Sequence, residues 1–293
     1  FIVPILNEMI DFSFSHIESK DTSYDRFGEF YQIYKNILFG KIMIHLDAWF
    51  EANMCAVLGG LLDIIKPVNQ ISITSDNTRI VTILKKNGFL ANYGYSVEYD
   101  RNNTTIQYLK LKANENRYFS SYVNNELLTK TGFPSMTEAL KRKISESIYE
   151  IFVNAQMHSK SEYIYTCGQF YPKKQKIAFT IADMGQGFKA NINNRFRHNL
   201  SSIQAIKWAT ENGSTTKTDA PGGIGLAILK EFITMNKGNF QIVSYDGFYQ
   251  VGKGEKAIQL KHSFPGTVVN MEFRTDDTLS YSLASEADIS NIF

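Results

Sequence analysis

A carboxylate and an amide four residues apart, Glu150 and Asn154, are the first side chains in the sequence that could do chemistry together. On a helix, residues at this spacing share one face and lie about 6 Å apart along the axis. A carboxylate can polarise an attacking water, and an amide oxygen can bind Mg²⁺, which prefers hard oxygen ligands. The same spacing is common on solvated helix faces, so the pair needs support from other segments.

A second segment, Asp183-Met-Gly185-Gln-Gly187, directly follows the apolar stretch 177–182, which is predicted to be a strand. A carboxylate at the end of a strand can accept a hydrogen bond from the exocyclic amine of adenine. Glycines beyond it let the backbone approach a flat base closely. In isolation, the same residues would form an ordinary turn.

A third segment, Pro221-Gly222-Gly223-Ile-Gly225, precedes a predicted helix. Backbone N–H groups at the start of a helix, together with the helix dipole, form an anion site. No Gly-Lys-Ser/Thr follows, which excludes a Walker A loop, and the spacing does not fit the dinucleotide fingerprint. Taken alone, this segment would be an ordinary turn that leads into a helix.

A fourth residue, Thr267, begins a predicted strand, and its hydroxyl can support a bound base directly or through water. In this order, the four segments resemble the GHKL superfamily of ATPases and kinases, which includes gyrase, heat-shock chaperones, histidine kinases and mismatch-repair ATPases. Glu150 and Asn154 match its N box, and Thr267 matches its terminal threonine. The segments at Asp183 and Gly222 match its two glycine boxes.

The resemblance implies that the chain binds ATP with Mg²⁺. Glu150 would be the general base that orients the attacking water, Asn154 the Mg²⁺ ligand and Asp183 the residue that recognises adenine. The predicted loop from Lys189 to Pro221 would be a mobile lid over the phosphates. Catalysis would rest mostly on positioning and charge neutralisation.

Further residues complete the ATP-binding set that the resemblance implies. The glycines of the two boxes and the terminal threonine belong to it, namely Gly185, Gly187, Gly222, Gly223, Gly225 and Thr267. Three polar residues of the lid could contact the β- or γ-phosphate, although a flexible polar loop explains them equally well: Thr215, Thr216 and Lys217.

The elements that would position these residues indicate an α+β fold. We expect a long helix, Ser135–His158, capped by Ser135 or Thr137, with Glu138 at capping-box distance from Ser135. The other expected elements are a helix near Glu115–Lys130, strands at 163–170 and 176–182, helices at 201–211 and 224–236, and strands at 239–245, 257–260 and 266–274. The order predicts a Bergerat-type sandwich over residues 113–274, a mixed sheet with helices on one face, followed by a polar tail, 275–293.

Residues 1–112 are predicted to form a separate small α/β domain. The expected elements are helices within 1–38, strands at 41–46 and 70–74, helices at 53–65 and 78–86, and a hairpin of 95–100 with 105–111. The part from Lys41 to Gly88 is similar to STAS domains of the anti-anti-sigma type. In signalling STAS proteins a phosphorylatable Ser or Thr begins the first helix, but Ala52-Asn-Met-Cys55 has no hydroxyl. The resemblance therefore favours docking or dimerisation through this domain over phosphorylation.

Bulk properties narrow the classes of protein. The chain has 293 residues, of which 43% are hydrophobic and 20% charged, and its formal net charge is +2. Nothing in this balance indicates nucleic acid as a partner. Its two cysteines do not form a disulfide framework or a metal motif, which fits a reducing compartment and a cytoplasmic location. No apolar run approaches the roughly 20 residues that span a bilayer.

Three functions stay open at this point. The first is a slow, Mg²⁺-dependent ATPase that acts as a conformational switch in a bacterial-type signalling system. The second is a serine/threonine protein kinase of the anti-sigma-factor type that phosphorylates a partner, and the third is a non-catalytic nucleotide sensor. A protein partner would bind through the STAS-like domain, and the chain could also form a homodimer. Nothing after Arg274 resembles a transducer domain, which disfavours topoisomerase or mismatch-repair activity.

Overall fold

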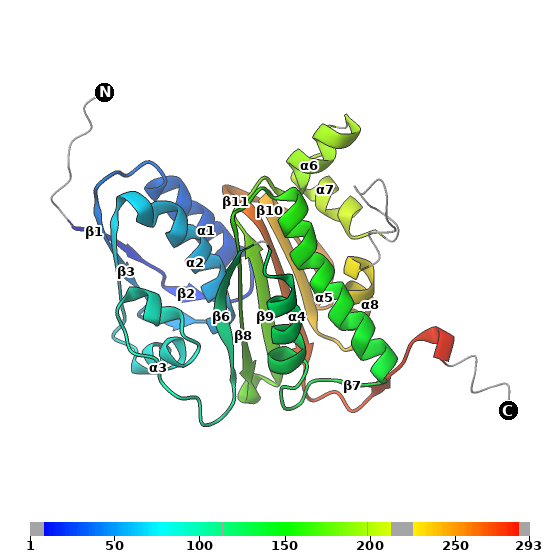
Figure 1. Cartoon of the computed structure of the whole chain (residues 1–293). Helices are drawn as coiled ribbons and strands as arrows, with labels where there is room; N and C mark the ends of the chain where they lie inside the picture. The colour runs from blue at the N-terminus through cyan, green and yellow to red at the C-terminus, as the bar shows by residue number, and fades with distance from the viewer. Residues whose placement is uncertain (1–8, 113, 198, 212–224, 287–293) are drawn as a thin grey trace, which may run out of the picture.

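The computed structural model describes residues 9–112, 114–197, 199–211 and 225–286. They form two units, which we call the N-terminal unit (residues 9–93) and the C-terminal unit (residues 105–281). The chain is an α+β protein with several sheets, as expected from the sequence. Figure 1 shows the N-terminal unit, coloured blue to cyan, on one side of a large central sheet.

The N-terminal unit is built on a three-stranded parallel sheet. Its strands have the order β1 (Met9–Ser13), β3 (Lys41–His45) and β5 (Gln70–Thr74). The other elements of this unit are α1 (Asp21–Tyr34), α2 (Cys55–Ile65) and α3 (Thr78–Lys86), the short 3-10 helices at Ala52–Met54, Lys66–Val68 and Phe89–Tyr93, and a two-stranded pair of β2 (His16–Ile17) and β4 (Trp49–Phe50). The predicted alternation of strands and helices is therefore confirmed, and both pairings of the three-stranded sheet are parallel.

Two predictions about this unit are wrong. Residues 9–18, the described part of the stretch before Ser19, are not helical but form β1 and β2, because Phe12 and Phe14 alternate with exposed serines, which is the period of a strand. Tyr95–Asp100 is not a strand either. The carboxylate of Asp100 accepts hydrogen bonds from the backbone N–H groups of Thr104 and Thr105, both at 2.7 Å. This stretch therefore forms a side-chain-supported turn instead of a hairpin.

The C-terminal unit contains a five-stranded sheet. Its order is β10 (Asn239–Val251), β11 (Lys256–Arg274), β9 (Lys176–Asp183), β8 (Tyr163–Tyr171) and β6 (Thr105–Lys112). All four pairings are antiparallel, so the expectation of a mixed sheet is wrong for this unit. The short connections between β8 and β9 and between β10 and β11 account for two of these pairings, because short turns join antiparallel neighbours. β6 precedes the predicted boundary at residue 112, yet it is an edge strand of this sheet.

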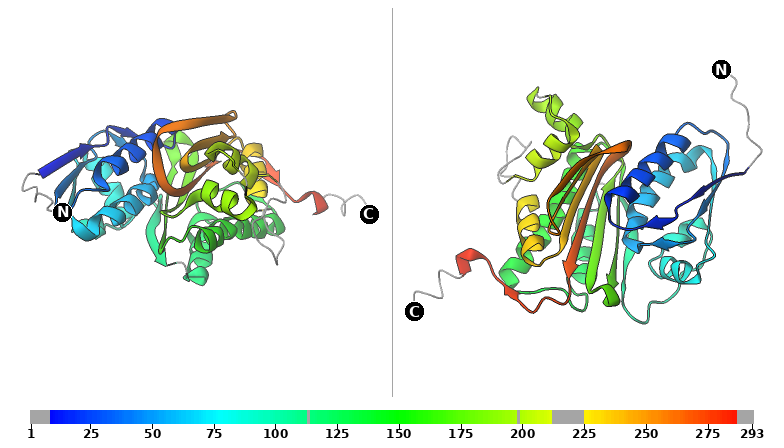
Figure 2. Two further views of the ribbon diagram at one scale, coloured as in Figure 1. Left: turned by 90° about the horizontal axis from the view of Figure 1, so that it is seen from above. Right: turned by 180° about the vertical axis from the view of Figure 1, so that it is seen from behind.

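Helices cover both faces of this sheet, so the expectation of helices on one face is also wrong. One face packs against helices of the C-terminal unit: α4 (Asn116–Tyr122), α5 (Glu138–His158) and α8 (Gly225–Met235). The opposite face packs against α1 and α2 of the N-terminal unit, and Figure 2 shows this arrangement from two further sides. Strand β9 is accordingly buried along its whole length, because side chains on both of its faces lie in a core.

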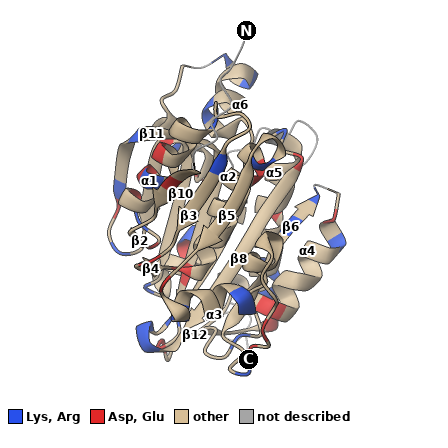
Figure 3. Ribbon diagram, turned by 90° about the vertical axis from the view of Figure 1, so that its left-hand side faces the viewer, with Lys and Arg blue, Asp and Glu red and all other residues tan. Residues whose placement is uncertain are grey.

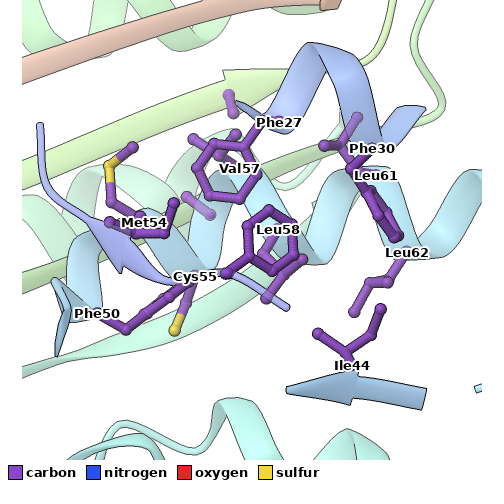
Figure 4. Packing of buried hydrophobic residues seen from close by; sticks show 14 of the residues in the cluster. Phe27, Phe30, Ile44, Phe50, Met54, Cys55, Val57, Leu58, Leu61 and Leu62 are labelled. Carbon is purple, nitrogen blue, oxygen red and sulfur yellow. The ribbon is translucent and has the colours of Figure 1, made fainter. Parts of the chain in front are cut away.

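The core between the two units is apolar at its centre. Figure 4 shows Phe27 and Phe30 of α1 gathered with Val57 and Leu61 of α2. Cys167 of β8 belongs to the same cluster, together with other residues from the facing strands: Tyr165, Ala182, Val243 and Val268. The two units therefore share one continuous core, which ties the N-terminal unit to the back of the sheet.

The segment from Lys189 to Leu200, predicted to be a loop, is mostly helical: α6 covers Gly187–Phe196. The segment is polar overall but contains a few apolar side chains. One of them, Ile192, is buried against α7 (Ser202–Ala209), where it contacts Ala205 and Ala209. A capping box formed by Ser201 and Gln204 begins α7. The strands predicted at 257–260 and 266–274 are parts of the single strand β11. The remaining elements are a short π-helical turn (Val123–Leu127), a 3-10 turn (Pro172–Lys174) and the pair of β7 (Ser135–Met136) with β12 (Ser280–Tyr281).

Candidate functional site

Helix α5 carries the carboxylate–amide pair. The side chain of Thr137 accepts a hydrogen bond from the backbone N–H of Leu140 at 3.3 Å. Thr137, and not Ser135, is therefore the N-cap. Ile148 and Phe152 are fully buried against the sheet. Glu150 and Asn154 lie on the flank of this apolar stripe, where both are half-buried.

Glu150 lies against the start of α8. Its Oε2 accepts a hydrogen bond of 3.0 Å from the backbone N–H of Gly225, the first residue of that helix. A carboxylate at this position interacts favourably with the helix dipole. A Cβ atom on Gly225 would lie 2.4 Å from Glu150 Oε2, so glycine allows the close approach. The structure thus brings together Glu150 and Gly225, which are 75 residues apart in the chain.

Asp183 is the last residue of β9 and is 5% exposed. Its Oδ1 accepts a hydrogen bond of 2.9 Å from the backbone N–H of Gly185. Burial raises the pKa of Asp183 to about 7, although hydrogen bonds from Gly185, Ser159 and Thr267 act in the opposite direction. Among the described residues no basic side chain contributes to this pKa, so the carboxylate is buried without a counter-ion.

Thr267 lies beside Asp183, because the two residues are paired in the register of β11 and β9. Thr267 is 9% exposed, and its Oγ1 lies 3.3 Å from the Oγ of Ser244 on β10. The same Oγ accepts a hydrogen bond of 2.9 Å from the backbone N–H of Phe188. Ser244 therefore connects the threonine to the start of α6.

The glycines after Asp183 allow close packing. Gly187 has a φ of +72°, and a Cβ atom there would lie 2.6 Å from Ser244 Oγ. Glycine adopts such a backbone conformation at no steric cost. A Cβ atom on Gly185 would lie only 1.9 Å from the backbone carbonyl oxygen of Ser159. We call residues 183–187 the Asp183 loop.

The Asp183 loop is attached to the end of α5. The backbone N–H of Gln186 donates to the carbonyl oxygen of Ser159 at 2.8 Å, and the backbone N–H of Met184 donates to Ser161 Oγ at 3.3 Å. Along α5, about 14 Å separate residue 150, which contacts α8, from residue 159, which contacts the loop. Helix α5 therefore spans from the start of α8 to the Asp183 loop, with Asn154 between the two contacts.

The predicted site residues thus fall into two groups. The structure brings Asp183, Gly185, Gly187 and Thr267 together, and it brings Glu150 to Gly225, with Asn154 on the same helix. Five others lie outside the described residues: Thr215, Thr216, Lys217, Gly222 and Gly223. The part of the predicted lid that is described contains α6 and α7 and is not a loop.

Sequence reasoning missed Ser159 and Ser244. Both reach the site only through tertiary contacts. Ser244 is paired with Thr267 in the sheet, and Ser159 follows α5 at the point where its carbonyl oxygen contacts the Asp183 loop. No sequence motif marks either residue. The only signal for Ser159 is its place five residues after Asn154, at the end of the predicted helix.

Two searches of the described residues concern other kinds of site. No group of three or more His, Cys, Asp or Glu side chains within them is arranged to hold a metal ion. None of the described helices combines the length and the apolar character that a bilayer crossing requires. Figure 3 shows basic and acidic positions interspersed over the side that carries α3, β3 and β5.

Comparison of the chain with models of known protein families found no match, and comparison with curated proteins found no relative.

Proposed function

We propose that the chain binds ATP with Mg²⁺ between α5, the start of α8 and the Asp183 loop, and hydrolyses it slowly as a conformational switch. The observation that carries the proposal is the buried carboxylate of Asp183, without a counter-ion among the described residues and beside Thr267, at the end of a sheet strand. A buried carboxylate without a counter-ion destabilises the fold. Its presence therefore favours a role in ligand binding.

On the base side, Asp183 can accept a hydrogen bond from the exocyclic amine of adenine. The glycines of the Asp183 loop leave no side chain between the backbone and a flat base. The hydroxyl of Thr267, held near Ser244 Oγ, supports the base from the neighbouring strand. A buried carboxylate at this position selects strongly for a base with an amine over a base with a carbonyl group there. With the carbonyl, the buried carboxylate would lose its hydrogen-bond donor.

On the phosphate side, the donor set suits a magnesium nucleotide. Asn154 and Glu150 offer oxygen atoms one helical turn apart, the ligand type that Mg²⁺ prefers, and Mg²⁺ needs few protein ligands when it binds phosphates. Asn154 would hold the ion, which supplies neutralisation of the phosphate charge. The backbone N–H of Gly225 points from the start of α8 and can donate to a phosphate oxygen once Glu150 releases it.

Glu150 then has two positions in the cycle. Without nucleotide it accepts the hydrogen bond from Gly225, and with nucleotide it orients the attacking water and accepts its proton. A bond forms between the water oxygen and the γ-phosphorus. The bond between the γ-phosphorus and the oxygen that bridges it to the β-phosphate breaks, and ADP leaves. This exchange gives the proposed switch a local structural basis at the contact between α5 and α8.

The fold is compatible with this proposal. The sheet is antiparallel and not mixed, but α5 and α8 lie together on one of its faces, which supports a Bergerat-like arrangement of these two helices over residues 115–274. The parallel sheet with α2 and α3 supports a STAS-like domain. Ala52 to Cys55 are buried, which supports a docking role for α2 and not phosphorylation at its start. Within this chain, α2 itself packs against the face of the five-stranded sheet that lies opposite α5 and α8.

The test is nucleotide binding by calorimetry with and without Mg²⁺, followed by measurement of phosphate release. We expect Asp183→Asn to weaken ATP binding by about tenfold or more, because the amide presents a donor to the adenine amine. We expect Glu150→Gln to keep ATP binding and to lower phosphate release by about a hundredfold. Glu146→Gln is the matched control, since Glu146 is exposed one turn earlier and pairs only with Lys143 among the described residues.

The outcomes separate the functions. A folded protein that ignores millimolar ATP in the presence of Mg²⁺ contradicts the proposal as a whole. Binding without phosphate release identifies a nucleotide sensor. Transfer of radiolabel from γ-labelled ATP to a protein side chain, abolished by Asp183→Asn, identifies a serine/threonine kinase instead of an ATPase.

A further inference from the structure

A polar cavity lies at the end of the sheet opposite the Asp183 loop. Its volume is about 340 Å³, and it opens between the N-terminal unit and the first residue of β9. The charged residues that line it include Glu51 from the N-terminal unit and, from the sheet and the turns between its strands, Lys174, Lys176, Lys253, Glu272 and Arg274. This cavity is unrelated to the proposed ATP site, because β9 separates the two along its whole length.

A row of alternating charges forms the floor of the cavity. Lys174 Nζ and Lys176 Nζ lie 3.2 Å and 2.9 Å from the same oxygen, Oε1 of Glu51. Lys176 Nζ is also 2.6 Å from Oε1 of Glu272, and Lys253 Nζ is 2.9 Å from its Oε2. Two carboxylates thus hold three ammonium groups side by side.

Every oxygen of the two carboxylates in this row already accepts a hydrogen bond. One oxygen of Glu51 lies near both Lys174 and Lys176, and the other accepts from the backbone N–H and the hydroxyl of Ser19, both at 3.0 Å. Each oxygen of Glu272 accepts from one lysine. Burial raises the pKa of Glu51, but the ammonium groups of Lys176 and Lys174 outweigh burial and hold this pKa below its usual value.

The ammonium groups are not saturated. Each lysine has three N–H donors and no acceptor. Within the described part of the chain, Lys253 Nζ forms an ion pair with Glu272 alone, and its side chain is 50% exposed. Lys176 engages two carboxylates and Lys174 engages Glu51 and Glu18. The remaining capacity of the three lysines is thus hydrogen-bond donation, which suits a ligand with several acceptor oxygens.

Many polar groups behind the row satisfy one another. Asn53 Nδ2 lies 3.0 to 3.1 Å from Ser19 Oγ, Thr180 Oγ1 and Asn270 Oδ1. Gln241 Nε2 donates to the carbonyl oxygen of Ser19 at 2.8 Å. Asn239 Oδ1, which also lines the cavity, is buried with no hydrogen-bond partner within the described part of the chain. The hydrogen bonds of Asn53 and Gln241 do not involve the lysines of the row, so they leave the remaining donors of these lysines unused.

We propose that this cavity binds a small anion whose negative charge is carried by phosphate or carboxylate groups, through Lys174, Lys176 and Lys253. The volume is at the lower end of small-molecule sites, so the ligand is small. The charged side chains lining the cavity comprise four cations, with Arg274, against three carboxylates, with Glu18. Because Arg274 pairs with Asp276 at 2.6 Å, the charges around the cavity are balanced, and an anion meets the three ammonium groups as directed donors.

The experiment is calorimetric titration of the whole chain with inorganic phosphate and, separately, with succinate. We expect Lys253→Gln and Lys174→Gln each to weaken binding of the preferred probe by about tenfold, because each removes a charge-assisted hydrogen bond. Lys173→Gln is the matched control. Lys173 lies on the same turn and is exposed but does not line the cavity. Its replacement should change binding by less than about twofold.

The results separate the alternatives. Binding of phosphate alone assigns a phosphate-bearing ligand, and binding of succinate alone assigns a carboxylate-bearing one. Failure of both probes to bind at about 20 mM overturns the proposal, as does binding that both lysine variants leave unchanged. Lys253→Gln removes a half-exposed side chain, and a circular dichroism melt verifies that this variant is folded.

Discussion

Strand β9 buries a charged side chain at each end, Lys176 at its start and Asp183 at its finish. Lys176 Nζ lies 2.9 Å from Glu51 and 2.6 Å from Glu272, and these carboxylates raise its pKa although burial acts to lower it. Asp183 has hydrogen bonds but no basic neighbour among the described residues, and burial raises its pKa to about 7. One strand thus presents a buried charge with counter-ions and a buried charge without them.

The difference indicates different roles. A buried ion that is paired on both sides keeps its charge and holds two elements together. A buried carboxylate without a cation is destabilising while it is ionised, so its position is better explained by a ligand that it recognises than by the fold. The comparison predicts that removal of Lys176 harms stability, whereas removal of the charge on Asp183 harms binding.

The largest effect is expected for Lys176→Met. The variant leaves Glu51 and Glu272 buried with fewer partners, which should lower the free energy of unfolding by about 3 kcal/mol or more. Urea unfolding followed by circular dichroism measures it. Lys173→Met is the control, because Lys173 is exposed. Its replacement should shift stability by less than about 0.5 kcal/mol. Equal unfolding midpoints for the two variants would show that the row of charges does not hold the units together.

An effect of comparable size concerns pH and Asp183. The pKa of this carboxyl is about 7 in the folded chain and 3.8 as its ordinary value, so the folded state binds the proton more tightly. Stability is therefore full below about pH 4 and falls as the pH rises to about 7, by up to about 4 kcal/mol.

The variant Asp183→Asn isolates this contribution. Other carboxyls, such as Glu18 and Glu51, have lowered pKa values and act in the opposite direction at lower pH. The difference in unfolding free energy between Asp183→Asn and the unchanged chain removes their effect. We expect this difference to grow in favour of the variant between about pH 4 and 7. A difference that is flat over this range would mean that Asp183 is ionised in the folded chain and is not the unpaired group described above.

The sequence predicts much of the local structure because local signals decide it. Helix α3 has the predicted bounds, since Asn77 caps it by accepting from the backbone N–H of Arg79 at 3.1 Å, and Gly88, with a φ of +80°, follows it. Both are ordinary signals for the start and the end of a helix. Strands β3 and β5 of the first unit and strands β8 and β9 follow from short β-rich stretches between turn residues. The pairing of Asp183 with Gly185 also needs only neighbours in the chain.

What the sequence does not predict depends on contacts between distant segments. Lys176 and Glu272 look like solvated positions of a strand, because nothing in the sequence reveals that the N-terminal unit covers the back of the sheet. Ser244 has a role only because β10 and β11 place it opposite Thr267. The division into two domains is predicted from the order of the expected elements and from the two resemblances, whereas the shared core and the position of β6 are matters of tertiary packing.

The smallest of these expected changes in stability is at Gly60 of α2, which faces Met184 of the Asp183 loop. A Cβ atom on Gly60 would lie 2.2 Å from Cε of Met184, the residue that follows Asp183. Because a methionine end is flexible, Gly60→Ala can displace it, and we expect the free energy of unfolding to change by less than about 1 kcal/mol. The displaced Met184 shifts the Asp183 loop, so ATP affinity should fall about threefold or more if the proposed site is correct.

A double variant shows whether this link acts through Met184. In Gly60→Ala with Met184→Ala, the shortened side chain leaves room for the added methyl group, so ATP affinity should return to that of Met184→Ala alone. Calorimetric titration of the four proteins forms a double-mutant cycle, whose coupling energy measures how strongly α2 acts on the Asp183 loop. An ATP-binding chain with zero coupling would mean that the N-terminal unit is attached to the sheet without sensing the nucleotide. A nonzero coupling would place Gly60 and Met184 on the route by which the switch reaches the first unit.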